Sequence, residues 1–228
     1  MNAPDQQGLL EQPPDDAEPN HMIARVNSVA IRAAFPFIAQ DDVRYYLCGV
    51  NIRPLEDGSV MVVATDGHRF IIIRDPAGYA EHEIIVSVSK DAIKHADSMA
   101  TFDVMSDGSA MWNDKSTAPL FIQPGKSVID GNYPRIESVV STLGYEEGIH
   151  GAINMNYLAD VLKIKIGTKA PAVRFFSSDE GAPLLFLLAG IGEIEVLGGI
   201  MKMQDATEWL PKWLPTPGEF KLAQEVSA

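Results

Sequence analysis

The sequence predicts an α+β fold in which one supersecondary unit occurs three times: a strand, a short helix and then antiparallel strands. Short amphipathic segments lie near residues 28, 90 and 156. Each follows an apolar strand-like run and precedes further apolar runs separated by turn signals. With 228 residues, 46% of them hydrophobic, the chain can form one large domain or two small ones. A helix on a few strands cannot bury its apolar face alone, so we expect the units to pack against one another.

The first unit begins near Met22, where "IARV" predicts a strand and "NSVAIRAAF" a helix. Asn27 or Ser28 can cap this helix, and Pro36 ends it. The runs "RYYLCGVNIRPL" and "SVMVVATD" are typical of a hairpin around the turn "EDGS", and "RFIIIRD" predicts the next strand.

The second unit repeats this order. A predicted strand "HEIIVSV" precedes the helical segment "SKDAIKHADSM", which Ser89 can cap. The runs "ATFDVMSDG", "SAMWND" and "APLFIQPG" predict strands after it. Helical spacing places one apolar stripe on Ala92, Ile93, Ala96 and Met99.

In the third unit, "GIHGAINM" predicts a strand and "NYLADVLK" a helix with an apolar face of Tyr157, Leu158, Val161 and Leu162. Strands are then expected over "AVRFFSSD", "APLLFLLAG" and "GEIEVLGGIMKM". Although 184–201 is strongly apolar, it contains Glu193, Glu195 and several glycines, which favour buried strands over a membrane span.

Charge and composition restrict the functional class. The formal net charge is −13, which disfavours simple adhesion to nucleic acid through Lys and Arg. Residues 1–20 carry five of these net negative charges and 204–228 carry two, so the middle carries −6. Cys48 is the single cysteine, in an apolar strand-like run, so no disulfide is expected and a reducing, cytoplasmic location is predicted. The acidic, proline-rich start lacks the pattern of an export signal.

The stretch "ATDGHR" between two apolar runs has two interpretations. Asp66 could orient His68 for acid or base catalysis, although no nucleophile motif accompanies the pair. Alternatively, Gly67 permits a tight structural turn, which is the interpretation we favour. We therefore expect no enzyme activity. No cofactor and no metal are predicted either, because "GIGEIE" lacks the third glycine of a dinucleotide loop and the five histidines lack metal-ligand spacing.

Several blocks together resemble the bacterial DNA polymerase III β subunit family, the sliding clamps. The blocks "DVRYYLCGV", "VATDGHRF", "NYPRIESVV", "INMNYLADVL" and "IMKM" occur in that family's order over Met22 to Met203. The resemblance implies a DNA-clamp fold of repeated βαβββ half-units, with antiparallel sheets outside and helices lining one face around duplex DNA. A family protomer has six half-units, whereas this chain shows three. The predicted organisation is a disordered acidic arm (1–21), a clamp-like domain of two half-units (22–142), a third half-unit (143–203) and a tail containing Trp and Pro (204–228).

The resemblance also implies a surface groove that binds short linear peptides. Apolar walls would accept Leu or Phe of a peptide, and a few polar groups would fix its backbone. Ser138 stands where the family usually has a basic residue and Gly199 where it has a larger apolar one, so peptide preference is expected to differ. The groove residues carried over are Leu47, Thr65, Gly67, His68, Arg69, Phe70, Pro134, Val139 and Met201.

A DNA-facing surface is expected on the helices, because passage of duplex DNA requires positive charge facing the phosphates. Lys90 and Lys94 lie four residues apart and therefore on one helix face. Asp91, Asp97 and Asp160 on the same helices leave open that these are ordinary solvated faces. The candidate residues are Arg25, Arg32, Tyr45, Tyr46, Lys90, Lys94, Lys163, Lys165 and Lys169.

The function expected from the resemblance is that of a non-catalytic processivity factor. A homo-oligomeric ring would encircle double-stranded DNA without reading its sequence, and the groove would tether a DNA polymerase or other clamp-binding proteins. Four copies would supply twelve half-units, and a clamp loader is a further candidate partner. Two alternatives stay open. One is a non-ring clamp mimic, encoded by a phage or other mobile element, that competes for clamp-binding peptides; the other is a hydrolase using His68 and Asp66.

Overall fold

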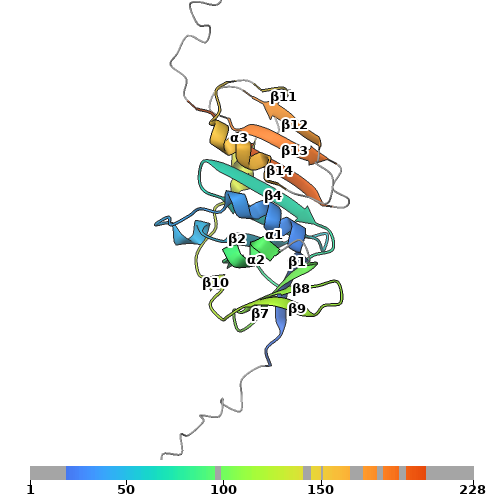
Figure 1. Cartoon of the computed structure of the whole chain (residues 1–228). Coiled ribbons are helices and arrows are strands. Elements are labelled where there is room, and N and C mark those ends of the chain that lie inside the picture. Colours follow the sequence, from blue (N-terminus) through green and yellow to red (C-terminus); the bar gives the residue numbers. More distant parts are fainter. Residues whose placement is uncertain are drawn as a thin grey trace, which may run out of the picture.

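Two antiparallel sheets dominate a computed structural model of the chain (Figure 1), which describes residues 19–95, 99–140, 145–149, 151–164, 172–178, 182–189 and 194–203. The five-stranded sheet has the order β5-β1-β7-β8-β9 and the nine-stranded sheet the order β10-β6-β2-β3-β4-β14-β13-β12-β11. The first sheet comprises β1 (Met22–Asn27), β5 (Tyr79–Ala80), β7 (Thr101–Met105), β8 (Ala110–Asn113) and β9 (Pro119–Gln123). The second comprises β2 (Val50–Pro54), β3 (Val60–Thr65), β4 (Arg69–Asp75), β6 (Ile84–Val86), β10 (Val128–Ile129), β11 (Glu146–Glu147), β12 (Ala172–Ser177), β13 (Leu184–Ala189) and β14 (Glu195–Ile200).

Among the described residues, short α-helices precede the strand runs: α1 (Ser28–Ala34), α2 (Lys90–His95) and α3 (Met155–Val161). The predicted caps of the first two are confirmed. The Asn27 side chain accepts a hydrogen bond from the Val29 amide at 2.9 Å, and the Ser89 hydroxyl accepts from the Asp91 amide at 3.2 Å. Pro36 lies in the 3-10 helix that follows α1, Phe35–Phe37, so the α-helix ends where expected. Further 3-10 turns cover Tyr45–Leu47 and Ile136–Val139.

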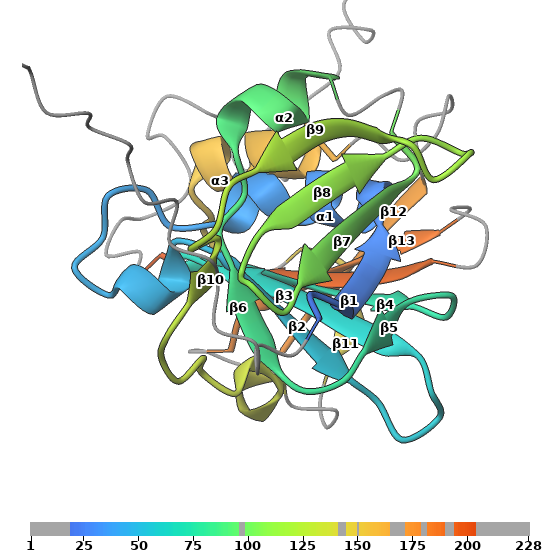
Figure 2. The same ribbon diagram turned by 90° about the horizontal axis from the view of Figure 1, so that it is seen from below.

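The first two units exchange their leading strands. β1 leads into α1 but pairs with β7 of the second unit, and β6 leads towards α2 but pairs with β2 of the first. Each unit therefore completes the other's sheet, and α1 contacts β3 and β4 of its own unit as well as β7 of the other. Figure 2 shows α1 behind the β7–β9 strands. The predicted α+β fold of repeated units is confirmed by this arrangement.

The main core lies between the two sheets and their helices. Its largest fully buried side chains are Trp112, Phe37, Phe102 and Phe186, and the Phe102 and Trp112 rings meet edge to face at 4.8 Å. The apolar run 184–201 forms β13 and β14, as predicted. No helix in the described ranges is long and apolar enough to span a membrane.

Three sequence expectations differ from the structure. The predicted strand at "RYYLCGV" begins only at Val50, and Cys48 follows a 3-10 turn, because the Asp42 carboxylate accepts bonds from the Arg44 amide and guanidinium and thereby starts a turn. The predicted strand "GIHGAINM" is reduced, among its described residues, to one isolated bridge from Ala152 to Met203. Leu162, expected on the apolar face of α3, is 80% exposed beyond the helix end. Ala96, most of the acidic arm and the tail 204–228 lie outside the described residues.

Two consecutive glycines in β14 admit aromatic rings on opposite faces of the sheet. Gly198 pairs with Phe186 of β13, and Gly199 pairs with Phe70 of β4. A Cβ at Gly198 would lie 2.0 Å from the Phe186 ring, and one at Gly199 would lie 2.3 Å from the Phe70 ring. The absence of side chains at both positions thus lets neighbouring strands cover β14 with phenylalanines.

Replacing Gly198 with alanine is expected to lower the free energy of unfolding by about 1–3 kcal/mol, because the fully buried Phe186 ring cannot move aside without repacking the core. Urea denaturation measures this change. The matched control is Gly125→Ala, where the nearest atom lies 3.5 Å from the added Cβ. Equal stability of the two variants would contradict the close Phe186–Gly198 packing.

Candidate functional site: a surface groove

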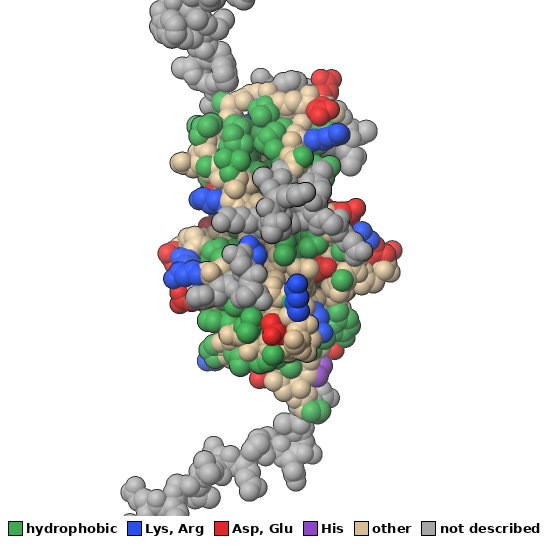
Figure 3. Space-filling view, turned by 45° about the vertical axis from the view of Figure 1, so that its right-hand side comes forward, with side chains coloured by type: hydrophobic (Ala, Val, Ile, Leu, Met, Phe, Trp, Pro, Cys, Tyr) green, Lys and Arg blue, Asp and Glu red, His purple; other side chains and the backbone are tan. Residues whose placement is uncertain are grey.

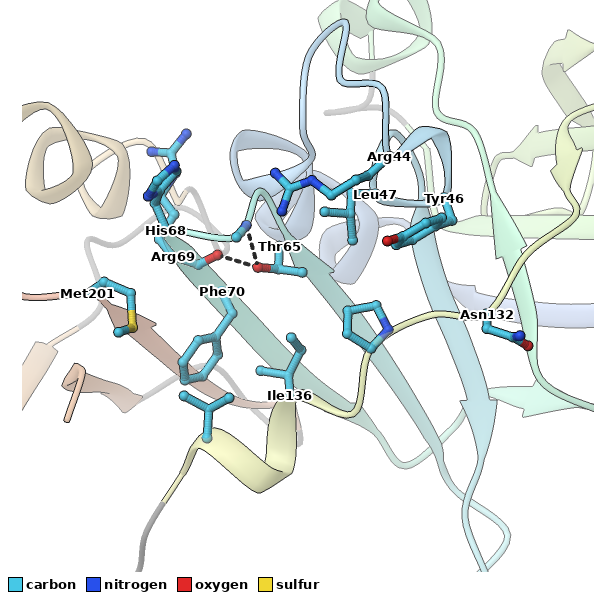
Figure 4. A pocket seen from close by; sticks show the side chains of 13 residues that line it. Arg44, Tyr46, Leu47, Thr65, His68, Arg69, Phe70, Asn132, Ile136 and Met201 are labelled. Atoms are coloured by element: carbon cyan, nitrogen blue, oxygen red, sulfur yellow. Dashed lines mark hydrogen bonds between the residues drawn. The ribbon is translucent and has the colours of Figure 1, made fainter. Parts of the chain in front are cut away.

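A cavity of about 380 Å³ opens where four segments meet: the turn Tyr45–Leu47, the β3–β4 turn, the segment before and through Ile136–Val139, and the residue after β14 (Figure 4). All nine groove residues expected from the sequence line this cavity. The full lining is Arg44, Tyr46, Leu47, Thr65, Gly67, His68, Arg69, Phe70, Asn132, Pro134, Ile136, Val139 and Met201. The nine-stranded sheet thus brings together residues as far apart in the sequence as Arg44 and Met201.

The "TDGH" turn between β3 and β4 forms one rim of the cavity and is held by its own side chains. Gly67 has φ of +91°, a conformation that favours glycine. The Thr65 hydroxyl accepts from the Gly67 amide at 3.0 Å and donates to the Arg69 carbonyl at 2.7 Å. The Asp66 carboxylate accepts from the amides of His68 and Arg69 at 2.9 and 3.1 Å. The conformation of this turn is therefore stabilised by the side chains of Thr65 and Asp66 and by the glycine at position 67.

This geometry bears on the catalytic interpretation of the same residues. Besides the two amides, the Asp66 carboxylate accepts a bond from Arg69 Nε at 3.0 Å. The His68 ring stacks on Tyr157 of α3, with centroids 6.1 Å apart and an interplanar angle of 18°. Asp66 consequently orients the backbone and Arg69 rather than the imidazole, which is the arrangement of a structural turn.

Arg69 joins the groove to the helix side of the molecule. Its side chain, 11% exposed, bonds to Asp66, to Asp160 of α3, and through Nη2 to the Pro36 carbonyl at 2.8 Å. The guanidinium carbon also lies 5.0 Å from the centroid of the Tyr157 ring. Burial raises the pKa of the Asp160 carboxyl, but hydrogen bonds and charge from Lys163 and Arg69 outweigh burial and hold that pKa below its usual value. The Arg69 guanidinium thus bonds to other groups of the protein, and Arg69 forms part of the groove wall.

The floor of the groove is apolar. Leu47, Phe70 and Ile136 are buried, whereas Val139 at the rim is 43% exposed. Phe70 lies over Gly199, so this glycine provides the space that the ring fills. Beneath the floor, the Tyr133 hydroxyl accepts from the Thr65 amide at 3.0 Å, and burial raises the pKa of this phenol.

Four lining residues were not among those expected from the sequence: Arg44, Tyr46, Asn132 and Ile136. Tyr46, which is also one of the residues expected to face DNA, lines the groove. Arg44 bonds to Asp42 and to the Asp66 carbonyl at 3.2 Å, and its hydrogen bonds lower the pKa of the Asp42 carboxyl to about 2. These residues could have been found from the sequence only by their position, because they lie one or two residues from positions 45, 47 and 134, which were identified.

Ser138, singled out in the sequence analysis, lies on the 3-10 turn Ile136–Val139 beside the groove. Its hydroxyl donates to the Arg135 carbonyl at 2.7 Å. The nearby cation, Arg135, pairs with Glu83 at 2.9 Å. This side of the groove thus presents a neutral hydroxyl instead of a positive charge.

The residues expected to face DNA lie on several elements. Arg25 lies on β1, not on a helix, and donates two hydrogen bonds to the buried carboxylate of Asp103. Lys90 and Lys94 are exposed on α2, and Lys94 pairs with Asp91 at 2.8 Å. Lys163 pairs with Asp160. Arg32 lies on α1, Tyr45 is largely exposed, and Lys165 and Lys169 lie outside the described residues. Their role with DNA stays a prediction.

Metal ligation has no candidate within the described ranges, where no group of three or more His, Cys, Asp or Glu side chains is arranged to hold an ion.

Comparison with solved structures shows that the fold is that of bacterial DNA polymerase sliding clamps. The Pseudomonas aeruginosa sliding clamp matches with a TM-score of 0.57 and 19% identity, over 85% of this chain and 70% of the clamp. The C. crescentus β sliding clamp matches with 0.59 and 17%, over 86% and 69%. The H. pylori β clamp, solved in complex with diflunisal, matches with 0.59 and 12%, over 81% and 67%. No protein-family model and no curated protein matches this chain.

The Asp160–Arg69 contact is expected to stabilise the protein in a pH-dependent way. Because the folded-state pKa of Asp160 is lowered, its contribution is fully present above the ordinary aspartate pKa and is lost as pH falls through the folded value. Asp160→Asn should therefore lower the free energy of unfolding by about 1–3 kcal/mol at pH 7, and the difference from the unmodified chain should shrink below about pH 4. Urea titrations at several pH values measure this.

The matched control is Glu195→Gln, which removes a carboxylate of an exposed pair with Arg74 at 3.2 Å. We expect this change to cost less than about 1 kcal/mol. A destabilisation by Asp160→Asn that is the same at pH 3 and pH 7 would show that the ion pair is not its cause.

Proposed function

We propose that this chain is a non-catalytic, clamp-like tethering protein whose groove binds short linear peptides of a DNA polymerase or other replication or repair proteins. The single observation that carries this proposal is the convergence of the nine expected groove residues on one apolar-floored cavity. Its shape suits an extended peptide: buried apolar side chains form the floor, and the rigid β3–β4 turn supplies polar groups at the rim. The fold that this chain shares with solved DNA sliding clamps also supports the proposal.

The second part of the proposal is that the protein acts while held on duplex DNA by an oligomeric ring. A closed ring cannot leave DNA sideways, so weak contacts with phosphates are sufficient and the ring can slide. Because each chain has three half-units, four copies would supply the twelve half-units of a complete ring. A clamp loader belongs to this part of the proposal.

A second candidate function is that of a non-ring mimic that competes for clamp-binding peptides. One observation favours it: the groove is complete, whereas Arg25, Lys94 and Lys163 are each paired with a carboxylate. The net charge of −13 also disfavours adhesion to the phosphates of DNA.

Peptide binding is tested with a fluorescein-labelled peptide carrying Leu and Phe anchors and with a version in which both anchors are serine. Val139→Asp should weaken binding of the anchored peptide about tenfold or more, because it places a charge against the apolar anchors. Fluorescence anisotropy measures the affinity. The control is Leu120→Asp, a change of a 49% exposed residue on β9, which should leave affinity unchanged. Equal binding of the two peptides would refute the groove assignment.

Ring closure is tested by gel filtration of the protein on circular and linear duplex DNA, with any loader supplied in both reactions. A topological link predicts retention on circular DNA and loss after the DNA is linearised, with little dependence on salt once the ring is closed. Equal loss from both forms of DNA, together with intact peptide binding, would select the mimic over the ring.

A further inference from the structure

One wall of the groove is formed by residues 132–140, the wall segment. Four of its residues line the cavity (Figure 4): Asn132, Pro134, Ile136 and Val139. Within the described part of the chain, its backbone hydrogen bonds join its own residues to one another, such as the bond from the Ser138 amide to the Arg135 carbonyl at 3.2 Å. The position of this wall against the sheet therefore depends on side chains. The space-filling view in Figure 3 shows charged side chains of both signs close together on the molecular surface.

Three other residues of the wall segment, at alternating positions, bond to the sheet or directly beside it. The Tyr133 hydroxyl accepts a hydrogen bond from the last amide of β3 at 3.0 Å. Arg135 donates to the carboxylate of Glu83, the residue before β6, at 2.9 Å. The Glu137 carboxylate accepts from Arg53 Nη1 on β2 at 2.8 Å. Two of these three contacts are ion pairs, and both lead to the same neighbourhood on β2 and β6.

Arg53 connects these two ion pairs. Its Nη1 bonds to Glu137, and its Nε lies 3.6 Å from the Glu83 carboxylate. The same Nε donates to Asn51 Oδ1 at 2.6 Å, and the fully buried Asn51 amide in turn donates to Glu83 at 3.1 Å. One guanidinium is thus placed between a carboxylate of the wall segment and a carboxylate at the start of β6.

The burial of Arg53 calls for an explanation. Val50 and Ile52 pack into the main core, so Asn51 and Arg53 face the other side of β2, where the smaller core lies beneath the groove. Arg53 is only 7% exposed, and its buried Nη2 donates to no group among the described residues. An unsatisfied buried donor costs stability, and an apolar side chain of similar size is often at least as stable in such a place. Stability of the sheet alone therefore does not account for an arginine here.

We propose that Arg53 is a positioning residue of the groove. It lines no part of the cavity, but by holding Glu137 it fixes the wall segment at a set distance from the floor. A wall that is held in place before a peptide arrives loses less conformational freedom on binding, and the affinity is higher for that reason. This inference rests on the proposed function, because its ligand is the same anchored peptide.

The test is Arg53→Met, which removes both ion pairs and keeps an unbranched side chain. We expect it to weaken binding of the fluorescein-labelled anchored peptide about tenfold, measured by fluorescence anisotropy. We also expect faster hydrogen–deuterium exchange at the amides of Ser138 and Val140, which bond within the wall segment. Glu137→Gln weakens the same contact at a 41% exposed carboxylate, so it tests the contact without disturbing a buried group.

The matched control is Arg74→Met. Arg74 also bridges two carboxylates, Asp57 at 2.7 Å and Glu195 at 3.2 Å, but it does not line the groove or contact the wall segment. This change should leave both the peptide affinity and the exchange of the wall segment as they are in the unmodified chain. A comparison of the two arginine variants therefore separates loss of any bridging arginine from loss of this one.

A double-mutant cycle supplies the decisive readout. If Arg53 acts through Glu137, combining Arg53→Met with Glu137→Gln weakens binding by less than the product of the two separate fold-changes. Independent effects, or exchange that is the same in Arg53→Met and Arg74→Met, overturn the inference. Faster exchange with unchanged affinity also overturns it, because Arg53 would then be merely structural. An unmodified chain that binds no anchored peptide refutes the proposed function instead, and exchange at Ser138 and Val140 then decides whether Arg53 holds the wall.

Discussion

The pairing of β4 with β14 is the constraint on which the rest of the structure depends. It joins the first unit to the third over six residue pairs, from Arg69–Ile200 to Arg74–Glu195. It also brings the β3–β4 turn next to the residue after β14, where the Met201 amide donates to the His68 carbonyl at 2.8 Å. The contact requires Gly199, because the Phe70 ring lies where any side chain at this position would project. Without this joint the groove would lose one wall and part of its floor.

Arg69 transmits the same constraint to the helix layer. It begins β4, bonds to the turn through Asp66, and reaches Asp160 of α3 and the Pro36 carbonyl after α1. Strand pairing fixes the distance between the units, and this guanidinium fixes the position of α3 against them. Arg69, which the sequence predicted as a groove residue, lines the groove and also links it to the helices.

Much of the fold could be predicted from the sequence because local signals agreed with the final structure. The caps at Asn27 and Ser89 and the alternating strand "RFIIIRD" needed no knowledge of distant contacts. The segment "GIHGAINM" shows where such reasoning ends. Its pattern is that of a strand, but a strand forms only where another unit offers an open edge, and no local signal reveals whether one does.

The positions of the groove residues could be predicted from the sequence, but the hydrogen bonds that these residues make could not. The carried-over positions fixed which residues converge, whereas the hydrogen bonds that engage Asp66 and Arg69 depend on α3 and on the residues after α1, far away in the sequence. Likewise, Arg25, Lys94 and Lys163 could be identified from the sequence, but their pairing with Asp103, Asp91 and Asp160 depends on side-chain geometry. Sequence patterns place side chains on elements; tertiary contacts decide which of them are free to bind a partner.

The two faces of β4 separate the groove from the helix surface. Side chains alternate along a strand, so Phe70 and Ile72 pack into the smaller core beneath the groove, while Ile71 and Ile73 pack into the main core below the helices. The same alternation continues in β14, where Gly199 faces Phe70 and Gly198 faces Phe186. The groove on one face and the main core on the other thus use different side chains of the same strands. A side chain on one face of β4 can therefore change without altering the contacts made on the other face.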